Sequence, residues 1–331
     1  MCNCKGQWYR VTPTLLQIIP GLMLCFAGII LPSSPRWLMS KTRENTSEVL
    51  EILRKLRKKG SQNSDIVAEF DGIKRELDLE HESTTSESSQ ESTRRLMRHR
   101  LILGIGIQIF SQLTGINIIM YYGPDVFKFA STGESPDKAG MNGIVGSINI
   151  FFTIVAIFCV EKIGRRILLI SGAIVMGISM FVIGVTMGAT GSLDSNRTTA
   201  EYSIVISNQY AVNTIIAFIC IFVAAFAVSM GPIHWIYCSE IFPRTKRATG
   251  ASLATVAHWF AGAIISLITP WLLHKIWFGT YLIFGSLCFI ISILIYLFYP
   301  ETKGFSLEKM DELFGGPIFV RLFWSRTQQT D

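Results

Sequence analysis

Amide and hydroxyl side chains interrupt one of the long apolar runs of this sequence. The stretch QLTGINIIMYY, residues 112–122, contains Gln112, Asn117 and Tyr121, and Gln108 precedes it by one helical turn. An amide left unpaired in hydrocarbon costs several kcal/mol. These groups must therefore either pair with neighbouring helices or face a water-filled path that a polar solute crosses.

The spacing of these amides favours a shared cavity. Gln108 and Gln112 are four residues apart and lie on one face of a helix. Asn117 would point about 140° away from Gln112 in an ideal helix, but local unwinding at Gly115 would bring it round. An amide offers donors and an acceptor together, which suits a neutral polyol, and Tyr121 could close the cavity. The alternative is that the amides only hold helices together.

Later apolar runs add further candidates. Asn149 lies in the next run, and the stretch GPIHWIYCSEIFP occupies residues 231–243. Pro232 in this stretch removes a backbone donor and predicts a hinge. Trp235 offers a flat apolar surface for the C–H face of a sugar ring, and His258 lies in the run that follows.

Two histidines are the titratable candidates at mid-helix positions. No Lys or Arg lies mid-helix between Leu101 and Tyr299, which leaves His234 and His258. Ionisable groups inside a membrane are costly and mark substrate or ion paths, so their scarcity argues against a charged solute and against a carboxylate proton relay. Each histidine is either a hydrogen-bonded packing residue or a carrier of protons.

A separate group of charged residues lies near the predicted helix ends. Carboxylates and arginines there can form bidentate pairs, which would hold the inner faces shut in one state and release them in another. The alternative is ordinary charge that sets membrane orientation. The candidate gate residues are Arg36, Glu161, Arg165, Arg166, Glu240 and Arg247.

The elements that must position these residues are membrane-spanning helices. Half of the 331 residues are hydrophobic and 16% are charged, against roughly 25% charged residues in a soluble domain. Apolar runs of this length without strand alternation predict helices rather than a barrel, so the expected fold is an all-α, multi-spanning membrane protein. The seven predicted transmembrane helices are 11–31, 101–127, 141–160, 167–190, 208–237, 249–273 and 279–299.

These runs divide the chain into four parts. Residues 1–35 hold a single transmembrane helix, and residues 36–100 form a cytoplasmic helical loop in which 81–93 is predicted to be a polar linker. Residues 101–299 form two sets of three helices, each opening with an interrupted helix, and residues 300–331 form a cytoplasmic tail. Interrupted helices at corresponding positions of two repeats indicate a substrate site at the membrane midplane.

The distribution of basic residues predicts the orientation. Of the 30 Lys and Arg, 24 lie on the side that carries residues 36–100 and the C-terminus, which places both in the cytoplasm. The net charge of +6 therefore reflects topology. The expected partners are the lipid bilayer, a solute and, through the histidines, protons, with no nucleic acid. No phosphate loop, metal spacing or nucleophile elbow appears, so neither an enzyme nor a cofactor is predicted.

Five motifs carry a family resemblance: PSSPRW, QLTGINIIMYY, VEKIGRR, GPIHWIYCSEIFP and PETKG, in this order. Together they resemble the C-terminal half of a sugar porter of the major facilitator superfamily, the glucose-transporter-like family. The resemblance implies a partial major facilitator fold and transport of a monosaccharide, a hexose, by alternating access. Uniport and proton symport both fit, in the plasma membrane or a vacuole. It implies sugar contacts at the amides and Trp235, and pairing among the gate residues.

The chain also departs from the family's pattern. His234 stands where the family usually has Pro, and His258 stands where the mammalian glucose carriers have Asn. Ser33 and Ser111 stand where the family usually has Glu and often has a second Gln. The resemblance begins at the family's sixth helix, so we expect a truncated transporter. The alternatives are a transporter-like sugar sensor, a regulatory half-carrier or an inactive fragment.

The charge distribution predicts which of two asparagines is glycosylated. We predict that Asn196, in the sequon Asn196-Arg197-Thr198, carries a glycan and that Asn45, in Asn45-Thr46-Ser47, does not, because only the outer side meets the glycosylating enzymes. The mobility shift on glycosidase treatment, compared between Asn196→Gln and Asn45→Gln variants, measures this. A glycan on Asn45 would invert the topology.

Overall fold

The computed structural model describes residues 18–31, 34–35, 38–39, 46–56, 66–68, 70–75, 87–120, 138–193, 204–206, 208–243 and 246–303. The chain forms two compact units, Met1–Gln90 and Glu91–Asp331. In the first unit, Val49 and Leu53 of α3 (Thr46–Leu56) pack with Phe70 in a small apolar cluster. The candidate residues that the structure describes lie in the second unit.

The structure confirms a membrane fold of helices. Six helices among the described residues are long and apolar enough to cross a membrane. A shorter apolar helix, Ile18–Ile30, lies within the predicted helix 11–31, whose first seven residues fall outside the described part of the chain. The elements from Glu87 onward are α5 (Glu87–Leu113), α7 (Lys138–Ile163), α8 (Arg165–Thr190), β1 (Gly191–Leu193), β2 (Ile204–Ile206), α9 (Gln209–Val228), α10 (Met230–Ile241), α11 (Arg247–Ile276) and α12 (Phe278–Phe298).

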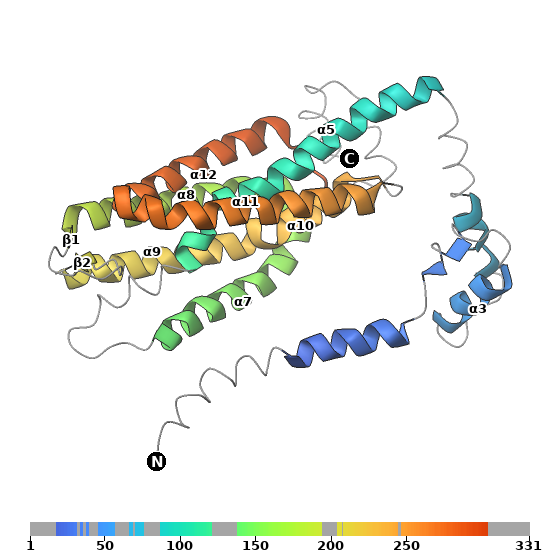
Figure 1. The fold of residues 1–331 in the computed structure, drawn as a ribbon, viewed down its shortest axis with the longest axis horizontal. Helices are drawn as coiled ribbons and strands as arrows, with labels where there is room; N and C mark the ends of the chain where they lie inside the picture. The colour runs from blue at the N-terminus through green and yellow to red at the C-terminus, as the bar shows by residue number, and fades with distance from the viewer. Residues whose placement is uncertain are drawn as a thin grey trace, which may run out of the picture. The chain divides into compact units, whose positions relative to one another are not determined.

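Helix α8 is central to the packing of the second unit. It packs against α12 on one side and against α9 on the other, while α9 also contacts α7 and α11 contacts α12 (Figure 1). Small residues allow the close approach of α8 and α12. A Cβ atom added at Gly177 would lie 3.1 Å from the Phe289 ring, and one at Gly184 would lie 2.9 Å from Leu282.

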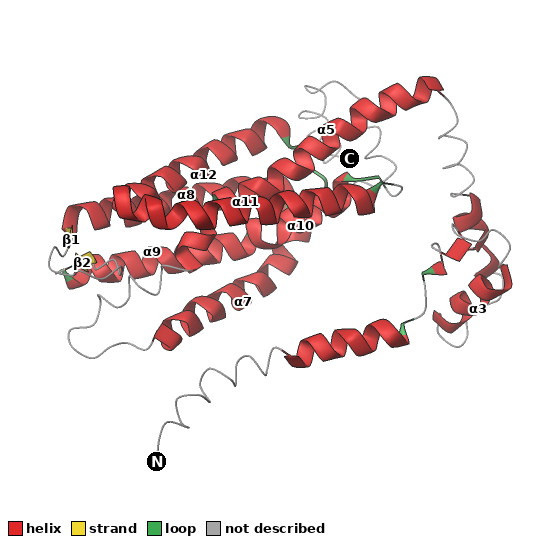
Figure 2. Cartoon of the chain, in the orientation of Figure 1, coloured by secondary structure: helices red, strands yellow, loops and turns green. Residues whose placement is uncertain are grey.

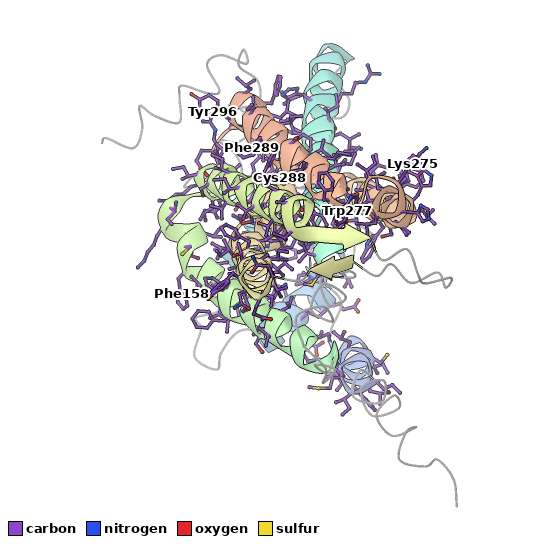
Figure 3. The ribbon with its side chains drawn as sticks, turned by 90° about the vertical axis from the view of Figure 1, so that its left-hand side faces the viewer. Phe158, Lys275, Trp277, Cys288, Phe289 and Tyr296 are labelled. Atoms are coloured by element: carbon purple, nitrogen blue, oxygen red, sulfur yellow. The ribbon has the colours of Figure 1, made fainter. Side chains whose placement is uncertain are left out.

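Two short strands close one end of this bundle (Figure 2). β1 pairs antiparallel with β2, and Gly191 lies opposite Ile206. Trp277, at the turn between α11 and α12, lies beside β1 (Figure 3), where its ring would be 2.9 Å from a Cβ at Gly191. Asn196 lies between the two strands in the sequence and outside the described residues.

Both predicted interruptions are present, and the first lies where the glycine is. Gly115 has φ +84°, and the N–H of Ile118 bonds to its carbonyl at 3.0 Å as a short helical segment resumes. The second interruption lies at Ser229, between α9 and α10, three residues before the predicted hinge at Pro232. A helical donor for the carbonyl of Val228 would have to come from Pro232, which has no N–H, so the ladder fails before the proline itself.

Helix α5 begins earlier than expected. Its first residue is Glu87, inside the segment 81–93 that was predicted to be a polar linker. Extending an existing helix gains one hydrogen bond per residue without a new nucleus, and Glu, Gln and Arg are good helix formers. The prediction of a linker is therefore wrong from Glu87 onward, because polarity alone does not end a helix.

The backbone at Gly115 generates a prediction about stability. Gly115→Ala should destabilise the bundle by about 1–2 kcal/mol, because L-residues are disfavoured at positive φ. The new methyl group would also lie 3.0 Å from Met180 Cε and 3.1 Å from Phe284 Cβ. Thermal unfolding in detergent measures the loss. Gly146→Ala in α7 is the matched control, since no atom lies within 4 Å of its added Cβ. Equal unfolding temperatures for the two variants would contradict the prediction.

Candidate functional site

Three side chains from α5, the segment after it and α11 form a hydrogen-bonded chain. Gln112 Nε2 lies 2.8 Å from His258 Nε2. Asn117 Nδ2 donates to Gln112 Oε1 at 2.7 Å, so the interruption at Gly115 does bring Asn117 to the same side as Gln112. Gly262 of α11 makes room for this arrangement, because a Cβ there would lie 3.2 Å from Gln112 Cδ.

Aromatic rings from α10 extend the cluster. The His234 ring stacks on the His258 ring with centroids 5.3 Å apart and planes at 13°. Trp235 lies 5.2 Å from His258 and is 42% exposed, whereas both histidines are buried. His234 Nδ1 bonds to the carbonyl of Met230. The cluster is therefore closed at the histidines and open at the indole and at Asn117, which is half-buried.

Gln108 lies one turn deeper and is fully buried. Its Nε2 donates to Cys238 Sγ at 3.5 Å, and its backbone carbonyl lies 3.3 Å from His258 Nδ1. Among the described residues its Oε1 has no hydrogen-bond partner, and neither does His234 Nε2. Buried polar atoms of this kind call for a water or a ligand group.

The structure does not bring every predicted site residue to this cluster. Asn149 is half-buried on α7, and its side chain bonds within its own helix, where Thr153 Oγ1 donates to Asn149 Oδ1 at 3.3 Å. Helix α7 packs on α9, α8 and α10. Tyr121 lies outside the described residues.

Two of the predicted gate residues, Arg165 at the start of α8 and Glu240 near the end of α10, lie at the end of the bundle opposite the strands. Arg165 Nη2 and Glu240 Oε1 form an ion pair at 2.9 Å. The other oxygen of Glu240 accepts a hydrogen bond from Thr302 Oγ1 at 2.6 Å. This carboxylate therefore joins the start of α8 and the end of α10 to the segment that follows α12.

Glu301 binds the beginning of α8. Its two carboxylate oxygens accept from the backbone N–H groups of Arg165 and Arg166, both at 3.0 Å. Oε1 also accepts from the N–H groups of Thr302 at 3.0 Å and Lys303 at 3.1 Å. An acidic group at a helix N-terminus satisfies orphan donors and complements the helix dipole. The sequence motif PETKG indicated this segment, but its spacing could not reveal the partner.

The remaining predicted gate residues have other positions. Arg166 donates to the carbonyl of Tyr296 at 2.6 Å and lies over its ring. Arg247 has two buried nitrogens, Nε and Nη2, without a hydrogen-bond partner among the described residues. Glu161 is exposed and makes no ion pair with the described part of the chain. Arg36 lies outside that part.

Sequence reasoning missed several contributors to the two clusters. Cys238 and Gly262 touch a predicted site residue and were not singled out, whereas the motif PETKG indicated the segment of Glu301 and Thr302 but not the partners of these two residues. His234 was recognised only as a titratable group, and its stacking on His258 depends on how α10 meets α11. These contacts join residues far apart in the sequence, so only the tertiary structure could supply them.

Comparison with known proteins identifies the family to which this chain belongs. The family described as "Sugar (and other) transporter" matches residues 2–314. The chain belongs to the sugar porter family of the major facilitator superfamily. This is a family of transporters rather than enzymes, and this sugar porter is a multi-pass membrane protein.

Its relatives include proteins named as sugar carriers. The "MFS glucose transporter mfs1" of Aspergillus flavus is 36% identical over 316 residues, which cover 94% of this chain and 59% of the relative. The "D-xylose-proton symporter" of Escherichia coli (strain K12) is 33% identical and covers 90% of this chain. The structure of the "proton:xylose symporter XylE bound to 6-bromo-6-deoxy-D-glucose" matches with a TM-score of 0.68 at 32% identity, over 90% of this chain and 57% of that one. The chain thus spans a little over half the length of its relatives.

The contacts of Glu301 generate a prediction. Glu301→Ala should destabilise the sugar porter's bundle by about 1–3 kcal/mol, because it leaves partly buried N–H groups at the start of α8 unpaired. Thermal unfolding in detergent measures this. Glu161→Ala is the control, because it removes an exposed glutamate near the same junction of α7 and α8. The stability of this variant should stay within about 0.5 kcal/mol of the parent. A smaller loss for Glu301→Ala than for Glu161→Ala would refute the assignment.

Proposed function

We propose that this chain supplies the sugar-binding half of a monosaccharide transporter that works by alternating access. The observation that carries the proposal is the hydrogen-bonded chain of His258, Gln112 and Asn117 beside the half-exposed indole of Trp235. Polar groups of this kind in a membrane protein indicate a substrate path. The interruptions at Gly115 and Ser229 lie next to them, as expected for a midplane site between repeats.

The chemistry of the cluster suits a neutral sugar. After their mutual hydrogen bonds, Gln112 and Asn117 each keep one N–H and at least one lone pair. A hydroxyl group also donates and accepts, so such amides can bind several ring hydroxyls. Trp235 offers an apolar face for the opposite side of the ring. We therefore expect a hexose, bound by Gln112, Asn117 and Trp235, with Gln108 and His258 behind them.

The same proposal assigns the cluster at Glu240 to a cytoplasmic gate. The Arg165–Glu240 pair joins two helix ends that must separate if the inner face opens. Basic residues of the α7–α8 junction lie at this end together with Lys303, whose Nζ donates to the Lys162 carbonyl at 2.7 Å, which supports a cytoplasmic C-terminus. We place the transporter in the plasma membrane, as a uniporter or a proton symporter.

The test is a sugar affinity measured in a complete carrier, made by joining this chain to a matching N-terminal half. Gln112→Ala and Asn117→Ala should each weaken hexose binding by about five- to 150-fold. This corresponds to roughly 1–3 kcal/mol for leaving buried polar groups unpaired. Surface expression should hold, and isothermal titration or competitive binding gives the affinity.

A control separates binding from packing. Gln209→Ala changes an amide at the start of α9 that is exposed and bonds only within its own helix among the described residues, so it should leave the affinity unchanged. If Gln112→Ala and Asn117→Ala lower the amount of folded carrier and leave the affinity of the remainder intact, the amides only hold helices together. The sugar site would then lie elsewhere.

A further inference from the structure

The cluster around His258 has a defined hydrogen-bond direction. A carbonyl oxygen only accepts, so the contact of His258 Nδ1 with the Gln108 carbonyl at 3.3 Å places a proton on Nδ1. In a neutral imidazole the other nitrogen is then an acceptor. His258 Nε2 therefore accepts from Gln112 Nε2 at 2.8 Å.

The tautomer of His258 also determines the orientation of the Gln112 and Asn117 amides. Because the Gln112 NH2 group faces His258, its Oε1 must face the opposite way, and there it accepts from Asn117 Nδ2 at 2.7 Å. Asn117 is thereby left with its Oδ1 and one N–H free. With the other imidazole tautomer, both amides would turn over, and Asn117 would instead bond through its Oδ1 and present its NH2 group.

We propose that His258 is a positioning residue that sets the orientation of the Gln112 and Asn117 amides, and so the order of donors and acceptors offered to the sugar. It acts from behind these amides: His258 is buried at 8% exposure, and its ring is covered by His234. The proposal rests on the proposed function in one respect: it assumes that the unpaired N–H groups and oxygen atoms of the two amides face the sugar.

The rings around His258 explain why its orientation is fixed. His234 stacks on one face, Trp259 meets the ring edge-on at 5.6 Å, and Trp235 lies 5.2 Å away. His234 is itself held by the Met230 carbonyl. A ring flip of His258 would give up the Gln108 and Gln112 contacts together, so the packing and the hydrogen bonds favour the same ring orientation, and the hydrogen bonds then specify the tautomer.

The first experiment needs no sugar. The 331-residue chain, with ¹⁵N-labelled histidine and side-chain amides, is placed in a lipid nanodisc and studied by NMR. His258, assigned by its loss in His258→Phe, should show a protonated Nδ1 and an unprotonated Nε2. A spectrum with the proton on Nε2 would overturn the proposal.

The second measurement follows the relay to Asn117. His258→Phe should shift the Asn117 side-chain amide signals, although these two residues are joined only through Gln112 among the described contacts. His274→Phe, the same substitution near the end of α11, is the control and should leave them in place. His258→Gln should keep the signals close to those of the parent, because a glutamine amide reaches about as far as Nε2 and can accept there. His258→Asn, which is too short, should not. Unchanged Asn117 signals in His258→Phe would refute the relay.

The third measurement uses the joined carrier and a double-mutant cycle. His258→Phe and Asn117→Ala should each lower the hexose affinity. The loss in the double variant should differ from the product of the two single losses by about 2- to 160-fold. The conservative variant His258→Gln should keep an affinity near that of the parent. Additive losses would mean that His258 acts independently of Asn117, against the proposal. If the NMR results hold and no variant changes hexose affinity, the relay stands and the proposed sugar site fails.

Discussion

The constraint on which this structure depends is that a polar group inside a membrane-spanning bundle must be hydrogen-bonded. Gln112 satisfies it at both ends of its amide, through His258 and Asn117. The second of these bonds is available only because the backbone leaves the helix at Gly115. A defect in one backbone ladder is thus the condition for pairing a side chain that would otherwise be costly to bury.

The two interruptions achieve similar ends by different chemistry. At Gly115 the backbone enters a region that residues with a Cβ rarely occupy, whereas at Ser229 the ladder fails for lack of a donor three residues later. The first interruption therefore lies at the glycine itself, whereas the second lies three residues before the proline that causes it. Between them the helices present Gln112 from α5 and the rings of His234 and Trp235 from α10 to one ring on α11, that of His258.

The sequence predicted the class of fold and the identity of the central amides, because apolar length and buried amides leave few physical solutions. It also predicted that Gly115 would turn Asn117 toward Gln112. It could not predict the partner of Gln112, since the distance from residue 112 to residue 258 is set by helix packing. Asn149 illustrates the same limit: its type suited the site, but α7 carries it to contacts with its own helix. At the proposed gate, charge indicated Arg165 and Glu240, which form an ion pair, but could not rank them above Glu161 or Arg247.

The position of Glu301 bears on where the packed helix bundle ends along the chain. The last candidate span among the described residues ends at Phe298, yet the donors at the start of α8 are satisfied by a carboxylate three residues further on. The closely packed helices α8 and α12 are therefore joined at this end by residues that follow the last described span. A boundary drawn by hydropathy would exclude these residues, and the ends of α8 and α12 nearest Glu301 should move as one rigid piece when the other helices shift.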